Sequence, residues 1–334
     1  MRQTLLDAWS RRGPLARLLW PLSVLYGVLT GLRRFLYRVG VFKAGQAGVP
    51  VVVVGNVIAG GAGKTPVVMA LVKHLQARGW QVGVVSRGHG RHSSGCREVH
   101  PDDHPGDVGD EPALIRRRCN APVFVASRRW QAARALLRAY PRTQLIVCDD
   151  GLQHYALART VEIAVIDGQR GLGSGWRLPA GPLREPVSRL QSVDLVVVNG
   201  AWRAADSMPG AAATMTLTAA PWQPVRADEV ASVPTSGPVH AVAGIGHPPR
   251  FFALLAEQGF QPIPHAFPDH HAYTAGDLQF SPPAPVVMTE KDAVKCAGIA
   301  PPNSWYVPVQ AILPDSFWQA LTQRLAPWRT SDAG

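Results

Sequence analysis

A glycine-rich segment of the chain carries the residue types that bind phosphate groups. It reads Ile58-Ala59-Gly60-Gly61-Ala62-Gly63-Lys64-Thr65 and follows the apolar run Val51–Val54. Glycines let the backbone approach an anion closely, so that its N–H groups point at phosphate oxygens. The lysine reaches the β- and γ-phosphates, and the threonine hydroxyl can ligate Mg²⁺. Ile58 stands where the strict Walker A pattern has a glycine. We predict that this segment binds ATP. The alternative interpretation is a glycine-rich turn that binds no ligand.

Acidic residues end a second apolar run. Leu145–Cys148 is followed by Asp149 and Asp150, and then by Gln153 and His154. A Walker B strand delivers a carboxylate to Mg²⁺ in this way. Apolar strands ending in aspartate are common, so the Walker B interpretation of this run is supported mainly by the presence of the glycine-rich segment. The two aspartates are candidate metal ligands, while Gln153 and His154 either position water or substrate or make local turn hydrogen bonds.

Several polar segments each allow two interpretations. Asp110 precedes an apolar helix-like run, where an aspartate is usually a helix cap. Asp269, His270 and His271 lie together, but no cysteine or third histidine lies at metal-ligand spacing, which favours a hydrogen-bonded His–Asp pair, catalytic or structural. Two further runs, at 86–91 and 178–186, carry arginine and fit either a site for anionic ligands or a solvated loop. A third run, at 289–292, is predicted to be a strand-to-helix cap.

The elements that would position these residues alternate between strand and helix. Apolar, β-branched runs predict buried strands, and helical spacing of apolar residues predicts helices between them. This alternation predicts a doubly wound α/β domain with a mostly parallel sheet. The expected strands are 51–54, 82–85, 145–148, 161–166 and 195–198, and the expected helices are 65–78 and 130–140.

The composition changes after Asn199. Residues 201–238 are rich in Ala, Pro, Thr and Ser, which suggests a connector. Alternation then resumes with strands 240–243, 286–288 and 305–309 and helices 250–258 and 315–325, which predicts a second, smaller α/β lobe and a cleft between the lobes. We therefore expect an N-terminal segment at 1–48, a P-loop core at 49–205 and a smaller lobe at 206–334.

Basic charge is concentrated at the N-terminus. The chain carries 34 basic and 23 acidic residues, and residues 1–43 hold eight of the basic residues against one acid. These cations flank the apolar stretch 18–32, which is shorter than the roughly 20 residues that span a bilayer, and no signal-peptide cleavage pattern follows it. We expect this segment to lie on an anionic membrane surface. The alternatives are a helix pair packed on the protein and a nucleic-acid binder, although the latter does not explain the clustering. The chain has four cysteines, which are scattered along it and form no C-x-x-C pair. This arrangement is typical of a protein in a reducing cytoplasm.

Taken in order, these motifs resemble those of the tetraacyldisaccharide 4′-kinase family, an enzyme family of lipid A synthesis in Gram-negative bacteria. The resemblance covers nearly the whole chain, and it rests on the segments 55–66, 86–88, 109–112, 149–154, 178–186, 243–246 and 289–292. It implies a two-lobed P-loop fold that uses ATP and Mg²⁺ to phosphorylate the 4′-hydroxyl of an acylated disaccharide 1-phosphate, forming lipid IVA. It also implies a position at the cytoplasmic face of the inner membrane, with neither nucleic acid nor an obligate protein partner.

The resemblance also implies roles for single residues. Lys64 and the backbone of the glycine-rich segment hold the phosphates, and Asp149, Asp150, Thr65 and Gln153 hold or order Mg²⁺. Asp110 is implied to be the base, His270 to orient it, and Glu185 to be a further acid beside Arg184. Two positions depart from the family pattern: a second histidine, His271, follows His270, and His89 stands where a tyrosine is common.

A partition- or maturation-type P-loop ATPase is the competing interpretation. Such proteins share a similar glycine-rich loop. They usually carry a lysine just before the two glycines, where this chain has Ala59, and they do not need an apolar N-terminus.

Overall fold

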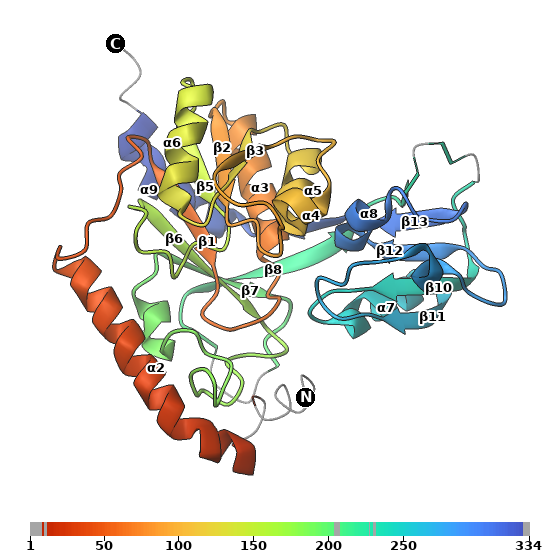
Figure 1. The fold of residues 1–334 in the computed structure, drawn as a ribbon, viewed down its shortest axis with the longest axis horizontal. Helices are drawn as coiled ribbons and strands as arrows, with labels where there is room; N and C mark the ends of the chain where they lie inside the picture. Colours follow the sequence, from red (N-terminus) through yellow and green to blue (C-terminus); the bar gives the residue numbers. More distant parts are fainter. Residues whose placement is uncertain (1–8, 10–11, 204–207, 227, 230–231, 330–334) are drawn as a thin grey trace.

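Two lobes of unequal size make up the molecule (Figure 1). The computed structural model describes residues 9, 12–203, 208–226, 228–229 and 232–329. A nine-stranded sheet forms the larger lobe and a five-stranded sheet the smaller one. The α/β fold class predicted from the sequence is confirmed.

The larger sheet runs in the order β14-β8-β7-β6-β1-β5-β2-β4-β3. The strands from β8 to β4 pair in parallel, whereas β14 and β3 are antiparallel edge strands. Its strands are β1 (Val51–Gly55), β2 (Val82–Ser86), β3 (Arg97–Val99), β4 (Val123–Val125), β5 (Leu145–Cys148), β6 (Val161–Asp167), β7 (Leu195–Asn199), β8 (Ala212–Ala219) and β14 (Val309–Ile312).

Helices cover both faces of this sheet. In β1, Val52 and Val54 pack into one core with residues of α3, α5 and α9, while Val51 and Val53 pack into another with residues of α6. Side chains alternate across a strand, so a run of valines serves both cores. The helices of this lobe are α3 (Lys64–Ala77), α4 (Pro105–Val108), α5 (Asp110–Arg118), α6 (Arg129–Ala139) and α9 (Asp315–Arg329), and a 3₁₀ turn covers Val187–Gln191.

The smaller sheet has the order β11-β10-β12-β13-β9, parallel except for β9. It consists of β9 (Gln223–Pro224), β10 (Gly237–Ala243), β11 (Phe260–Ala266), β12 (Val286–Thr289) and β13 (Ser304–Val307), with α7 (Pro248–Glu257), α8 (Glu290–Cys296) and a 3₁₀ turn at Ala275–Leu278. The strands and helices expected here at 240–243, 250–258 and 286–288 are present within a few residues.

The division between the lobes differs from the sequence expectation. Residues 201–238 were expected to be a connector, but they contain β8, which pairs with β7 in the larger sheet. The strand expected at 305–309 is two strands that separate at Pro308 and join different sheets. Proline lacks the N–H group that a continuous strand would need. The chain thus returns to the larger lobe, where α9 buries Phe317 and Leu321, whereas residues 309–329 were expected from the sequence to belong to the smaller lobe.

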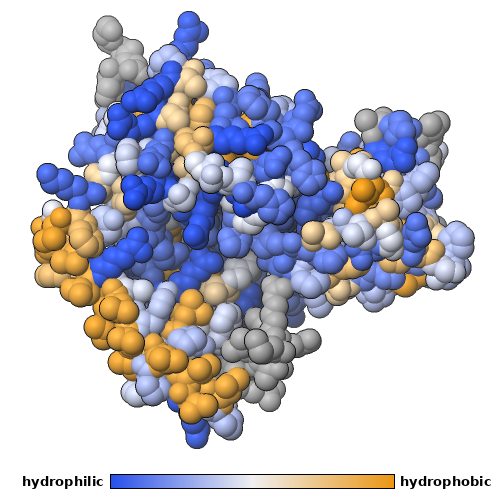
Figure 2. Space-filling view, in the orientation of Figure 1, coloured by the Kyte–Doolittle hydropathy of each residue, from blue (hydrophilic) through white to orange (hydrophobic). Residues whose placement is uncertain are grey.

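Helix α2 (Pro14–Arg38) lies along the flank of the larger lobe, on the side away from the smaller lobe (Figure 1). The helix contains Pro21 and continues through it for 25 residues in all, or about 37 Å. Only a minor part of its apolar surface is buried, and in length and composition it qualifies as a helix that could cross a membrane. Figure 2 shows apolar side chains gathered along this helix. Leu18, Leu25, Val28 and Leu29 are each more than half exposed.

Candidate active site

A cleft of about 1000 Å³ lies between the two lobes. From the predicted set, it is lined by Gly60, Gly61, Ala62, Gly63, Lys64, Thr65, Asp150 and His270. The sequence motifs from both lobes therefore meet at one place.

The glycine-rich loop connects β1 to α3 in a conformation that requires glycine. Gly60 has φ 105° and Gly63 has φ 88°, values that other residues rarely adopt. A Cβ atom on Gly63 would lie 2.5 Å from the Asn199 side chain, which donates a hydrogen bond to the carbonyl of Ala62. Helix α3 begins at Lys64, so its free N–H groups face the cleft as an anion site would need.

Two residues predicted to bind nucleotide lie outside the cleft. Ile58 is buried and forms a β-bridge with Leu183, and the Ala59 N–H donates to the carbonyl of Pro182. Their backbone is thus occupied by the 182–183 segment. The part of the loop that lines the cleft begins at Gly60. Ile58 lies before it, so the glycine of the strict Walker A pattern is not needed at this position.

Asp150 is held between two cations. Lys64 Nζ lies 3.5 Å from its carboxylate and Arg184 Nη1 3.3 Å. Burial alone would raise the pKa of Asp150, but these two cations lower it to about 2. Asp150 also has φ 44°, a strained value for a residue with a side chain. The carboxylate is therefore ionised and fixed beside the loop lysine.

Asp149 is buried behind Asp150. Ser86 Oγ donates to its Oδ2 at 3.0 Å, whereas Oδ1 has no hydrogen-bond partner among the described residues. Burial raises the pKa of Asp149 to about 7, and the negative charges of Glu111 and Asp150 contribute to this increase. A buried oxygen without a partner is costly, and a cation bound there would satisfy it.

The donor set fits Mg²⁺ bound together with a nucleotide. No group of three or more His, Cys, Asp or Glu side chains is arranged for a metal in the part of the chain that the structure describes. Mg²⁺ usually takes one or two carboxylates and completes its shell with water and phosphate oxygens. Thr65, Asp149 and Asp150 provide ligands of that kind.

Gln153 and Glu185 lie behind the cleft wall. Gln153 Nε2 donates to the carbonyl of Asn56 and to Glu185 Oε2, and its Oε1 accepts from Arg184. Glu185 is 5% exposed and also accepts from the Tyr155 hydroxyl. The structure therefore does not bring Glu185 to the cleft as a further acid. It holds Gln153, and Gln153 in turn holds Arg184.

Asp110 and His270 meet across the lobes. His270 Nδ1 and Asp110 Oδ2 are 3.0 Å apart. Burial would raise the pKa of Asp110, but the hydrogen bond from His270 and the charges of Lys295 and Lys291 lower it. The N-cap of α5 is Gly109, and no side-chain cap bond forms, so the cap interpretation of Asp110 is wrong.

The two adjacent histidines have different partners. His271 Nε2 lies 3.3 Å from Asp277, whereas His270 faces Asp110. His270 has φ 64°; such backbone strain is often found at functional sites. His270 is thus the histidine of the site.

His89 and His154 occupy different environments. The His89 ring lies 5.2 Å from that of His270 and lines the cleft, where partial burial and then His270 lower its pKa. His154 lies outside the cleft lining: its Nε2 accepts from the N–H of Arg129, and burial lowers its pKa to about 4. The backbone N–H of His154 also donates to the carbonyl of Gly151, which is the local turn hydrogen bond of the simpler interpretation.

Sequence reasoning missed two cations of the cleft. Lys291 lies 3.1 Å from Asp269 and 3.6 Å from Glu111. It comes from the 289–292 run, whose cap interpretation is confirmed because the Asp292 N–H donates to the side chain of Thr289. Arg250 of α7 reaches across to Asp167 at 3.5 Å. Lys291 lies within a run that was singled out in the sequence, so it could have been found. Arg250 lies in no motif, and nothing in the sequence pointed to it.

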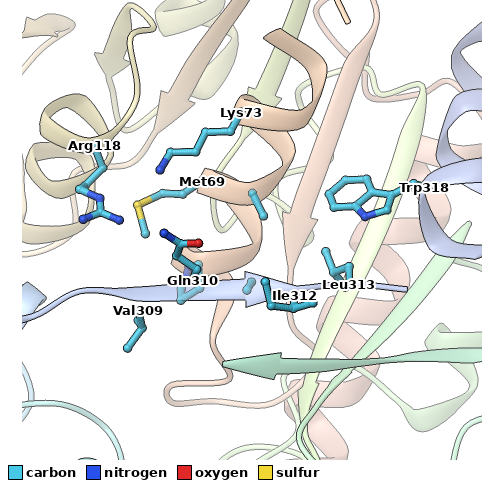
Figure 3. A pocket seen from close by; sticks show the side chains of 11 residues that line it. Met69, Lys73, Arg118, Val309, Gln310, Ile312, Leu313 and Trp318 are labelled. Carbon is cyan, nitrogen blue, oxygen red and sulfur yellow. The ribbon is translucent and has the colours of Figure 1, made fainter. Parts of the chain in front are cut away.

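A smaller cavity of about 260 Å³ lies on the other side of Met69 and Pro66, which line both hollows. Figure 3 shows Lys73 and Arg118 near Met69, and Trp318 beside Leu313. None of the predicted site residues lines this smaller cavity.

Comparison with known proteins identifies relatives over the whole chain. The family model described as LpxK, tetraacyldisaccharide-1-P 4′-kinase, matches residues 15–326. A tetraacyldisaccharide 4′-kinase of Acidovorax sp. (strain JS42) is 48% identical, covering 99% of this chain and 97% of the relative. One from Alkalilimnicola ehrlichii is 51% identical, with 91% of each chain covered. The crystal structure of LpxK from Aquifex aeolicus in complex with ATP is similar with a TM-score of 0.77 and 26% identity, covering 93% of this chain and 99% of that one.

Proposed function

Because the chain belongs to the tetraacyldisaccharide 4′-kinase family, we propose that its interlobe cleft transfers the γ-phosphate of ATP to the 4′-hydroxyl of a tetraacyldisaccharide 1-phosphate. The chain is a kinase of lipid A synthesis, and the expected product is lipid IVA. One observation carries the assignment of the cleft: the phosphate-binding loop with Lys64 and Asp150 shares the cleft with His270, whose ring contacts Asp110. Family membership leaves no support for the partition-type ATPase alternative.

The loop side of the cleft binds and neutralises the nucleotide. Backbone N–H groups of residues 60–65 point at the phosphates, and Lys64 and Arg184 add positive charge. Thr65, Asp149 and Asp150 would hold Mg²⁺, which supplies charge neutralisation at the phosphate oxygens when bound. Phosphoryl transfer depends mainly on such positioning and charge stabilisation.

The opposite side accepts the proton of the sugar hydroxyl. Asp110 is ionised at neutral pH because its pKa is lowered, so it can only accept hydrogen bonds and His270 Nδ1 must donate. This bond fixes the direction of the carboxylate, whose second oxygen is left for the 4′-hydroxyl. Asp110 acts as the base and His270 orients it.

Helix α2 brings the enzyme to its substrate. An acylated disaccharide stays in the membrane, and the exposed apolar side chains of α2 match the interior of the lipid headgroup region. The other face of the helix packs on the protein through Ser23 and Gly27, which favours a helix lying on the cytoplasmic surface of the inner membrane over one that crosses it. Neither nucleic acid nor an obligate protein partner has a part in this function.

A transfer assay tests the function. The enzyme is incubated with γ-³²P-ATP and purified tetraacyldisaccharide 1-phosphate, or with the same lipid lacking the 4′-hydroxyl. We expect labelled lipid only from the intact acceptor. Labelling of the 4′-deoxy lipid, or of neither lipid, would refute the assignment.

A further inference from the structure

Helix α2 has a second face, turned toward the active site. Its exposed face carries the apolar side chains described above, but Ser23 is only 5% exposed. A Cβ atom on Gly27 would meet the guanidinium group of Arg177, so glycine at this position leaves room for that side chain against the helix.

Two hydroxyl groups on the inner face bind the 177–184 segment. Ser23 Oγ donates to the carbonyl of Arg177 at 2.7 Å and accepts from the N–H of Ala180 at 2.9 Å. The Tyr26 hydroxyl donates to the carbonyl of Arg184 at 3.2 Å. Ser23 Oγ thus satisfies the backbone N–H of the buried Ala180, whereas the Arg177 carbonyl also accepts from the N–H of Gly181.

The same segment is bound on its other side to the approach to the phosphate-binding loop. The Arg184 N–H donates to the carbonyl of Val57 at 2.7 Å, and the Ala59 N–H donates to the carbonyl of Pro182 at 2.8 Å. The segment thus lies between α2 and the loop, and its last residue extends a guanidinium group to Asp150 and Gln153.

We propose that Tyr26 and Ser23 are positioning residues for phosphoryl transfer, which hold the backbone of the 177–184 segment so that the Arg184 guanidinium stays beside Asp150 and Lys64. The inference rests on the proposed kinase function and extends it, because the helix that faces the membrane also sets the geometry of an active-site cation. A displaced guanidinium would stabilise the charge of the transition state less well, so the loss falls on kcat.

The test measures lipid phosphorylation by Tyr26→Phe in detergent micelles, with γ-³²P-ATP and tetraacyldisaccharide 1-phosphate. We expect kcat to fall about three- to tenfold, the effect of losing one hydrogen bond, while the KM for ATP and binding to anionic vesicles stay near the wild-type values. Ser23→Ala should lose more, since it removes two bonds. Should Ser23→Ala fail to fold, the Tyr26→Phe variant still decides the question.

Matched controls remove hydroxyls from the same helix. No hydrogen bond of the Tyr37 hydroxyl is found among the described residues, and Thr30 Oγ1 bonds only to α2 itself. Tyr37→Phe and Thr30→Ala should therefore keep the wild-type kcat. A Tyr26→Phe enzyme as active as Tyr37→Phe would overturn the inference.

A double-mutant cycle separates positioning from general destabilisation. In an Arg184→Ala background, Tyr26→Phe should cause no further loss, because the group that it positions is absent. An equal fold-loss in both backgrounds would contradict the inference. A wild-type enzyme that forms no labelled lipid would contradict the proposed function, and this inference with it.

Discussion

Lys64 and Asp150 form an ion pair at the mouth of the phosphate-binding loop, 3.5 Å apart. The lysine side chain is about one-tenth exposed, so its charge is less screened by water than that of a surface lysine. Arg184 shares the same carboxylate. Both cations are thus fixed before the nucleotide arrives, which lowers the cost of reorganisation during transfer.

Replacing Lys64 with alanine should lower kcat at least about a hundredfold, the scale of losing one charge stabiliser. Lys73→Ala is the matched control, since Lys73 lies on the same helix and lines the smaller cavity instead. Initial rates of lipid phosphorylation at saturating ATP check this, and equal rates for both variants would remove Lys64 from the reaction.

Replacing His270 with alanine should lower kcat more than ATP affinity and shift the pH dependence of kcat. The hydrogen bond from His270 is the largest contribution that lowers the pKa of Asp110. Without it the carboxylate takes up a proton at higher pH, so activity that wild type retains on acidification should be lost at a higher pH in the variant. His271→Ala, whose partner is Asp277, should keep the wild-type profile; an unshifted profile for His270→Ala would place this histidine outside the mechanism.

At the level of elements, deletion cannot separate the two roles that we propose for α2. Removal of residues 1–43 would abolish membrane contact, but it would also remove the hydrogen bonds from Ser23 and Tyr26 to the 177–184 segment. Substitutions on the exposed face are therefore the sharper test of membrane binding.

Changing Leu18, Leu25 and Leu29 together to glutamine should weaken binding to anionic vesicles at least about tenfold, since each side chain loses its transfer into the membrane interface. All three are more than half exposed, so folding and ATP binding should be unchanged. Vesicle flotation and nucleotide titration measure the two properties. Undiminished flotation would show that α2 does not form the membrane contact.

The sequence predicted the elements well where the signal is local. Four consecutive valines before a glycine-rich loop describe β1, and an apolar run ending in two aspartates describes β5. It failed where pairing is non-local: nothing in 212–219 shows that this run joins β7, and nothing before Pro308 shows that β13 and β14 belong to different sheets. The position of Glu185 is non-local in the same way, because an acid beside Arg184 can point either way along its loop, and only tertiary packing directs it to Gln153.

On the scale of the whole molecule, the proposed catalytic groups are divided between two lobes. Asp110 lies on α5 of the larger lobe and His270 in the smaller one, so their hydrogen bond forms only when the lobes meet. Arg250 and Asp167 make a second contact across the cleft. The two-lobed arrangement thus brings the proposed base, its histidine partner and the glycine-rich loop into the same interlobe region.

The most direct test of this account is the single-turnover rate of phosphate transfer from enzyme-bound ATP to tetraacyldisaccharide 1-phosphate, compared between Asp110→Asn and Asp107→Asn. Both substitutions remove a carboxylate from the same short stretch, but only Asp110 bonds His270. We predict that Asp110→Asn binds ATP normally and transfers phosphate at least about a hundredfold more slowly, while Asp107→Asn reacts at the wild-type rate. Transfer by Asp110→Asn at the wild-type rate would contradict the account.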